Sequence, residues 1–165
     1  MSKKNVFILC GIPASGKSTW AKNNKDILNG NTMVVSRDKI RYSLLKNGDK
    51  YFSKEKEVYN IFIKVIKFGL NNKNINNIII DATHLSVGSR RKLLISLEKE
   101  LKKVNVFGIA FSTPLDVCLK RNTKRCGRAK VPKEQLENMY KNFTIPKKDE
   151  GFDEIYIIKS LKELK

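Results

Sequence analysis

One short segment of the chain has glycine, lysine and serine at the spacing that binds phosphate groups. Residues 11–18 read GIPASGKS and match the pattern G-x-x-x-x-G-K-[ST] in full. The glycines allow backbone angles that turn successive amide groups inward to hold phosphate oxygens. We expect Lys17 to reach the β- and γ-phosphates of a nucleoside triphosphate and Ser18 to hold Mg²⁺. The residues expected to contact the nucleotide here are Gly11, Ser15, Gly16, Lys17, Ser18 and Thr19.

The residues on either side of this loop favour its phosphate-binding role. An apolar run, Val6–Cys10, precedes it and is typical of a buried strand, and residues 18–22 can begin a helix. A phosphate loop works where a strand leads into a helix N-terminus, so the context is the required one. The alternative is a turn rich in glycine and serine with a chance lysine, which the flanking strand and helix argue against.

A phosphate loop alone predicts nucleotide binding, and other residues must decide between hydrolysis and transfer. Phosphoryl transfer needs a phosphate cradle, a metal ion, a group that takes the proton of the acceptor, and cations at the transferring phosphate. Asp38 is the candidate base. Arg41, three residues later, shares a helix face with it and is placed to grip a phosphate on the acceptor. Asp38 is equally suited to cap a helix N-terminus, and its pairing with Arg41 favours the catalytic interpretation.

A second carboxylate, Asp81, follows the apolar run Ile78–Ile80 and is the candidate magnesium-side aspartate. It can hold the metal through water, or it can order the following loop through backbone hydrogen bonds. Thr83 and His84 come next and are candidates for contact with the acceptor. A single histidine in a polar loop is more often a surface residue, so we expect no catalytic role for His84.

Three arginines in the C-terminal third have the pattern of a lid over a nucleotide. Arg121 and Arg125 are four residues apart and share a helix face, and Arg128 follows in a segment that contains glycine. Arginines that a lid brings to the phosphates supply a large part of the rate of phosphoryl transfer. The alternative is a solvated basic face. Arg90 and Arg91 are placed either to bind an acceptor strand or to cap a surface helix.

Apolar runs typical of strands alternate with segments of helical periodicity. The expected strands are 6–10, 33–35, 78–80, 104–111 and 155–158, and the expected helices are 17–26, 38–45, 58–68, 93–101, 115–124 and 133–143. This alternation predicts the three-layer α/β/α P-loop NTPase fold, with a mainly parallel five-stranded sheet and a helical lid at about 121–143. Ligands of such sheets bind beyond the carboxyl ends of the strands, where the polar residues named above gather.

Length and composition set further bounds. The 165 residues, of which 41% are hydrophobic, fit one kinase domain, 1–165. No apolar run approaches the ~20 residues that span a bilayer, and the N-terminus leads directly into the first expected strand, so we expect neither a membrane segment nor a signal peptide. Three cysteines without C-x-x-C spacing argue against a disulfide framework or a zinc site and favour a reducing, cytoplasmic location.

The net charge is +18, from 34 basic and 16 acidic residues. A field of this sign attracts polyanions such as nucleic acid. Most of the excess is lysine in a chain that is also rich in asparagine and isoleucine, a mixture that an AT-rich genome yields without selection for binding. The arginines are more informative, because they are few and lie beside the motifs, and their planar guanidinium suits phosphate recognition.

At this level of detail the chain resembles the kinase domain of phage-type polynucleotide 5′-kinases, within the small P-loop kinases that include zeta-toxin-like proteins. The similar segments are 11–20, 37–41, 81–84 and 119–125, followed by Val131-Pro132 and Met139-Tyr140. The resemblance implies that Asp38 is the general base, that Arg41 grips the acceptor, and that Arg125 is the lid arginine. It departs at His84, where the family usually has asparagine, and at Cys126, where glycine would be expected.

These observations predict an ATP- and Mg²⁺-dependent kinase that phosphorylates the 5′-hydroxyl ends of DNA or RNA. Lys17, Asp38 and Arg125 are the expected catalytic residues. Two other functions stay open. A kinase for a nucleoside, sugar or nucleotide-sugar would share the loop, the base and the lid. A nucleotide-binding switch or ATPase would need a residue that orients water instead of an acceptor base.

Overall fold

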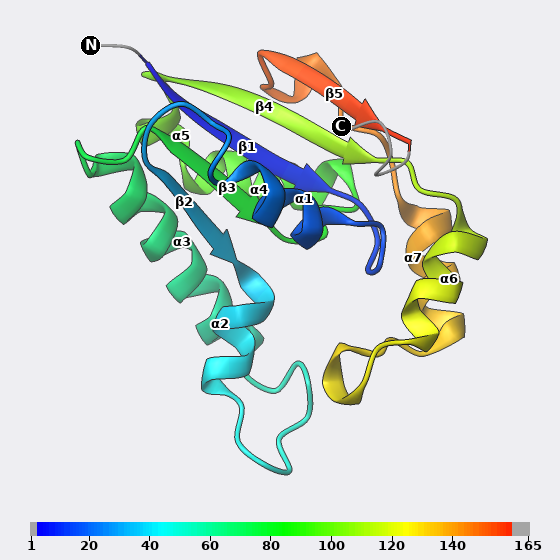
Figure 1. The fold of residues 1–165 in the computed structure, drawn as a ribbon. Coiled ribbons are helices and arrows are strands. Elements are labelled where there is room, and N and C mark those ends of the chain that lie inside the picture. The colour runs from blue at the N-terminus through cyan, green and yellow to red at the C-terminus, as the bar shows by residue number, and fades with distance from the viewer. Residues whose placement is uncertain (1–2, 160–165) are drawn as a thin grey trace.

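The computed structural model describes residues 3–159, and its centre is a five-stranded sheet (Figure 1). The strands are β1 (Lys4–Cys10), β2 (Thr32–Ser36), β3 (Asn77–Asp81), β4 (Val104–Phe111) and β5 (Glu154–Ile158). They lie in the order β2-β3-β1-β4-β5, and every pairing between neighbours is parallel. The carboxyl ends of all five strands therefore meet at one edge of the sheet.

Helices cover both faces of this sheet. They are α1 (Lys17–Asn24), α2 (Arg37–Leu44), α3 (Glu55–Asn71), α4 (Val87–Ser96), α5 (Glu98–Leu101), α6 (Leu115–Thr123) and α7 (Lys133–Asn142). Figure 1 shows α1 on one face, α3 to α5 on the other, and α6 with α7 beyond the carboxyl end of β4. None of the described helices is long and apolar enough to cross a membrane.

Side chains along the central strands point alternately to the two faces of the sheet, so one hydrophobic core forms on each face. Ile78 and Ile80 pack with Phe62 of α3, whereas Ile79 packs with Trp20 of α1 on the opposite face. All three isoleucines are fully buried, as expected for a parallel strand that is covered on both sides. This packing holds α1 against one face of the sheet and α3 against the other.

The predicted fold class and all five predicted strands are confirmed, and the helices differ in their limits. The helix expected at 58–68 runs from Glu55 to Asn71. The single helix expected at 93–101 is two helices, α4 and α5, because the backbone of Leu97 leaves helical geometry. The segment between α6 and α7 contains a 3₁₀ turn, Gly127–Ala129.

Candidate active site

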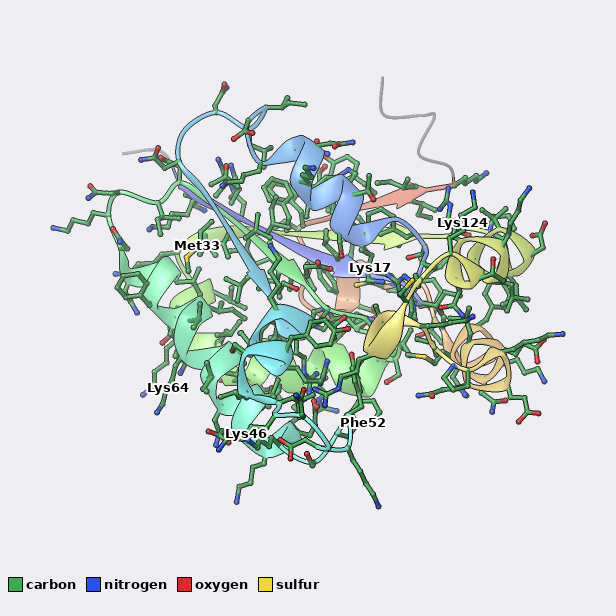
Figure 2. The ribbon with its side chains drawn as sticks, turned by 60° about the horizontal axis from the view of Figure 1, so that its bottom comes forward. Lys17, Met33, Lys46, Phe52, Lys64 and Lys124 are labelled. Atoms are coloured by element: carbon green, nitrogen blue, oxygen red, sulfur yellow. The ribbon has the colours of Figure 1, made fainter. Side chains whose placement is uncertain are left out.

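A cleft of about 1350 Å³ opens at the carboxyl edge of the sheet, between the phosphate loop, α2 and the segment after α6. It brings together most of the predicted site residues. Those on its wall are Lys17, Ser18, Asp38, Arg41, Asp81, Thr83, Arg125 and Arg128. Lys17 and Phe52 both line this cleft, and Figure 2 labels Lys17 in the middle of the molecule and Phe52 below it.

The phosphate loop is built tightly between β1 and α1. Gly16 caps α1 with a φ of 107°, in the left-handed region where glycine avoids the strain of a side chain. A Cβ added to Gly11 would lie 2.9 Å from Ser15 Oγ and 3.0 Å from Phe111 Cβ, so the position has no room for a larger residue. The hydroxyl of Thr113 donates to the carbonyl oxygen of Ser15 at 2.8 Å and ties the loop to the end of β4.

Lys17 is buried within this loop. Its ammonium group donates to the carbonyl oxygen of Ile12 at 2.7 Å and to Ser15 Oγ at 3.5 Å, and it makes no ion pair with the described residues. Burial lowers the pKa of Lys17 to about 8, and the nearby charges of Asp81 and Asp38 only partly oppose that shift. Because nearby negative charges offset only part of the cost of burial, an anionic phosphate in the loop would stabilise the charged form of Lys17.

Ser18 and Asp81 form the candidate metal site. Ser18 Oγ donates to Asp81 Oδ2 at 2.8 Å. Burial raises the pKa of Asp81, and the hydrogen bond from Ser18 acts in the opposite direction. Both side chains offer the hard oxygen donors that Mg²⁺ prefers, and Mg²⁺ commonly takes one or two protein ligands and completes its shell with water and phosphate. Within residues 3–159 no group of three or more His, Cys, Asp or Glu side chains is placed to hold a metal.

Asp38 projects from the first turn of α2 at the cleft wall. Ser36 caps this helix, accepting from the amide of Lys39 at 3.4 Å, so the alternative role of Asp38 as the N-cap is wrong. Asp38 Oδ1 accepts a hydrogen bond of 2.9 Å from the Tyr51 hydroxyl and another from Arg41 Nη1. With its side chain 62% exposed, the carboxylate is oriented by two donors and still open to the cleft.

Arg41 is the buried partner of this carboxylate. Its Nε and Nη2 donate to Glu55 Oε2 at 3.2 Å and 2.8 Å, and its guanidinium carbon lies 4.7 Å from the centre of the Tyr51 ring. Tyr51 and Glu55 were not among the predicted site residues, and they lie 10 and 14 residues beyond Arg41. No local spacing rule links residues this far apart, so only the packing of α2 against α3 reveals them.

The structure contradicts the predicted role of Arg90 in acceptor binding. Arg90 is fully buried, and its Nε and Nη2 donate to the two carboxylate oxygens of Glu150 at 2.6 Å and 2.9 Å. Its Nη1 donates to the carbonyl oxygens of His84 and Thr144 at 3.1 Å and 2.8 Å. Every nitrogen is used inside the protein, so Arg90 ties the C-terminal segment to the loop after β3. Arg91 is exposed.

In the loop after β3, Thr83 lies in the cleft and His84 lies in the core. Thr83 lines the cleft, and its carbonyl oxygen accepts from the amide of Gly11 at 2.9 Å. His84 is buried rather than on the surface, and its Nδ1 lies 2.8 Å from the carbonyl oxygen of Leu9. Burial lowers the pKa of His84 to about 4, so the ring is neutral near pH 7 and holds the loop against β1.

The three arginines of the predicted lid have different surroundings. Arg125 lines the cleft, and its Nη1 donates to the carbonyl oxygen of Ala129 at 3.1 Å. Arg121 lies against the phosphate loop, with Nη1 3.4 Å from the carbonyl oxygen of Ala14. Arg128 reaches across the opening, where its Nη2 donates to the carbonyl oxygens of Lys46 and Asp49 at 2.7 Å and 3.2 Å. In Figure 1 the segment after α6 and the loop after α2 approach each other at this place.

Comparisons with known proteins agree with this geometry. A family model described as an AAA domain, AAA_33, matches residues 6–146. The L-seryl-tRNA(Sec) kinase of Methanococcus maripaludis is 34% identical over 149 aligned positions, which cover 86% of this chain and 53% of that protein. A protein of Autographa californica nuclear polyhedrosis virus, provisionally named a bifunctional polynucleotide kinase/RNA ligase, is 26% identical over 86% of this chain and 21% of its own length.

Solved structures include a chain from the Pnkp1/Rnl/Hen1 RNA repair complex, with a TM-score of 0.71 and 25% identity over 86% of this chain and 44% of that one. The chain thus spans about half or less of the length of each of these relatives.

Proposed function

Because this chain belongs to the AAA_33 family and has the fold of a P-loop kinase, we propose that it transfers the γ-phosphate of ATP to the 5′-hydroxyl end of a DNA or RNA strand. Its family and its kinase relatives make it an ATP-dependent phosphotransferase. The proposal adds the acceptor, the metal and the role of each residue.

One observation carries the proposal: Asp38 is an open carboxylate on the wall of the cleft that contains Lys17. A kinase needs a group that takes the hydroxyl proton of its acceptor, whereas an ATPase needs a residue that orients water. Asp38 is held by Tyr51 and Arg41, so its direction is set before the acceptor arrives. Preorganisation of this kind favours transfer to a positioned hydroxyl.

In the proposed reaction, the hydroxyl oxygen of the acceptor bonds to the γ-phosphorus as the bond from that phosphorus to the β–γ bridging oxygen breaks, releasing ADP. Asp38 takes the hydroxyl proton. Lys17 and Arg125 neutralise the charge that spreads over the transferring group. Mg²⁺, held by Ser18 and Asp81, would supply further charge neutralisation when bound with ATP. Arg41 is buried and fully hydrogen-bonded like Arg90, but unlike Arg90 it lies on the cleft wall, where it would anchor a phosphate of the acceptor by exchanging its hydrogen bonds to Glu55.

A second acceptor is favoured by the relative at 34% identity, which is named for seryl-tRNA(Sec). Its reactive group would be the serine hydroxyl at the end of a tRNA. Both acceptors present a hydroxyl joined to a polyanion, so the same base and the same loop would serve either one.

A label-transfer assay separates these functions. The protein is incubated with γ-labelled ATP and Mg²⁺ and with a panel of 5′-OH DNA and RNA oligonucleotides, seryl-tRNA, nucleosides and sugars. We expect label on the 5′-OH oligonucleotides, loss of transfer in Lys17→Ala, and loss of turnover with retained ATP affinity in Asp38→Asn. If only seryl-tRNA or only a small molecule acquires label, the proposed 5′-OH acceptor is wrong and the labelled compound is the acceptor.

A further inference from the structure

The cleft is longer than the reaction requires. From the phosphate loop it continues along the outer side of β2, because residues at both ends of that strand, Thr32 and Ser36, lie on its wall. Figure 2 labels Lys17 in the middle of the molecule and Met33 well away from it, near the start of β2. Pockets for small ligands measure about 300–1,000 Å³. This cleft must hold both ATP and the acceptor, and its volume of about 1350 Å³ leaves room for an acceptor beside the nucleotide.

We call this extension the β2 groove and define it by the cleft-lining residues Lys22, Lys25, Asn31, Thr32, Met33, Lys39 and Ile75. Because β2 is an edge strand with β3 as its sheet neighbour, no further strand covers this side. The five residues of β2 extend for roughly 16 Å at ~3.3 Å per residue. The groove is therefore longer than a single nucleotide needs.

Charge is divided along the cleft. The acidic residues on its wall, Asp38, Glu55 and Asp81, all lie at the catalytic end. The β2 groove has basic side chains instead: Lys22, Lys25 and Lys39 are exposed. Their ammonium groups make no hydrogen bond or ion pair among residues 3–159, so they are available to phosphate groups.

The floor of the groove is partly apolar. Met33 and Ile75 are half-buried, and both pack against the core on the α3 side of the sheet. A cleft lined by both exposed lysines and apolar side chains suits a single strand, whose backbone is charged and whose bases have flat apolar faces. A small-molecule acceptor would leave all of this unused.

We propose that the β2 groove binds the sugar-phosphate backbone of a single-stranded acceptor, on the 3′ side of the nucleotide that reacts at Asp38. This inference rests on the proposed function and adds the path of the strand. It follows that affinity depends on acceptor length, and that the dependence comes from Lys22 and Lys25 of the α1 side together with Lys39 of α2.

The test compares two 5′-OH acceptors, a nucleoside 3′-monophosphate and a ten-nucleotide single strand, in steady-state transfer. The variant is Lys22→Gln/Lys25→Gln. The matched control is Lys64→Gln/Lys103→Gln, which removes the same charge from exposed lysines outside the cleft and the lid; Figure 2 labels Lys64. We expect the groove variant to raise KM for the ten-nucleotide strand by on the order of tenfold and to leave KM for the monophosphate within about twofold.

Salt dependence gives a second readout. Neutralising two contacts to single-stranded phosphates should lower the slope of log(kcat/KM) against log[salt] by about 1.4 for the long acceptor. Three results would contradict strand binding in the β2 groove. KM for the two acceptors could rise equally in the groove variant, or the control variant could raise KM for the long strand as much as the groove variant does. The unaltered protein could also show no preference for the long strand.

Direct binding separates this inference from the proposed function. Fluorescence anisotropy with a labelled ten-nucleotide strand measures affinity without chemistry. If no 5′-OH end is phosphorylated but binding is present and falls in the groove variant, the groove stands and the proposed acceptor is rejected. If 5′-OH ends are phosphorylated and binding does not depend on Lys22 and Lys25, the proposed function stands and the groove is rejected.

Discussion

The hydroxyl of Tyr51 donates a hydrogen bond of 2.9 Å to Oδ1 of Asp38. Tyr51 comes from the loop between α2 and α3, whereas Asp38 lies in the first turn of α2. Burial raises the pKa of Tyr51 above its ordinary value, so its hydroxyl keeps the proton that it donates. Tyr51 is therefore a positioning residue for the carboxylate that we propose as the base.

Removing that hydrogen bond should slow transfer without weakening nucleotide binding. We expect Tyr51→Phe to lower kcat by about tenfold, since a hydrogen bond to a charged carboxylate is worth ~1.5–3 kcal/mol, of which ~1.4 kcal/mol corresponds to tenfold in rate, and its loss leaves Asp38 less well oriented. ATP affinity should stay unchanged. Tyr42→Phe is the matched control, because the Tyr42 ring lies 6.2 Å from that of Tyr51 and Tyr42 is exposed. Equal kcat values for the two variants would contradict the positioning role.

The pair Ser18 and Asp81 predicts how the protein responds to Mg²⁺. Asp81→Asn removes the charged oxygen donor, so transfer should require a higher Mg²⁺ concentration for half-maximal rate, with a shift on the order of tenfold or more. A Mg²⁺ titration at saturating ATP measures the shift. Asp26→Asn changes an exposed aspartate outside the cleft and should leave the titration as it is. An unchanged titration in Asp81→Asn would remove Asp81 from the metal site.

Substitutions of the lid arginines Arg125 and Arg128 should affect different kinetic constants. Arg125→Ala should lower kcat on the order of a thousandfold and weaken acceptor binding far less, since a cation at the transferring phosphate acts mainly in the transition state. Arg128→Ala removes the hydrogen bonds to Lys46 and Asp49 and should mainly raise KM for ATP, because the lid closes less often. Single-turnover rates at saturating ATP distinguish the two. A normal rate in Arg125→Ala would move the catalytic role to Arg121 or Arg128.

The buried pair Arg90 and Glu150 predicts a loss of stability rather than of catalysis. Arg90→Gln leaves the Glu150 carboxylate without its partner, and the free energy of unfolding should fall by about 3–5 kcal/mol. Urea unfolding at pH 7 measures this change. Arg91→Gln alters the exposed neighbour and should shift the midpoint little. A stable Arg90→Gln protein with weakened acceptor binding would restore the role first predicted for Arg90.

The lowered pKa of Lys17 predicts proton uptake when ATP binds. In the free protein the pKa is about 8, so above pH 8 the amine is mostly neutral. Anionic phosphates in the loop favour the charged form and raise this pKa, so binding at pH 9 should take up close to one proton, and binding at pH 7 almost none. Calorimetry in buffers with different ionisation enthalpies measures the uptake. Its persistence in Lys17→Met would assign the proton to another group.

Much of the fold and of the nucleotide site was predictable because the signals are local. The five strands appear as short apolar runs, and the phosphate loop is eight consecutive residues between a strand and a helix. The helix limits were less accurate, since the ends of α3 and the break at Leu97 depend on packing and not on periodicity alone. The prediction that polar residues gather at one edge needed only the rule that parallel strands end together.

By itself, the sequence determined the P-loop kinase fold and the cradle, because hydrophobic periodicity and the glycine-lysine spacing act over a few neighbouring residues. Only the tertiary structure decided the partners of the arginines that are bound by residues far away in the sequence. Arg90 is bound by Glu150, 60 residues away, and Arg128 reaches Lys46, 82 residues away. Such pairs depend on how helices pack on the sheet, and the cost or gain of burying a charge exists only once that packing has formed.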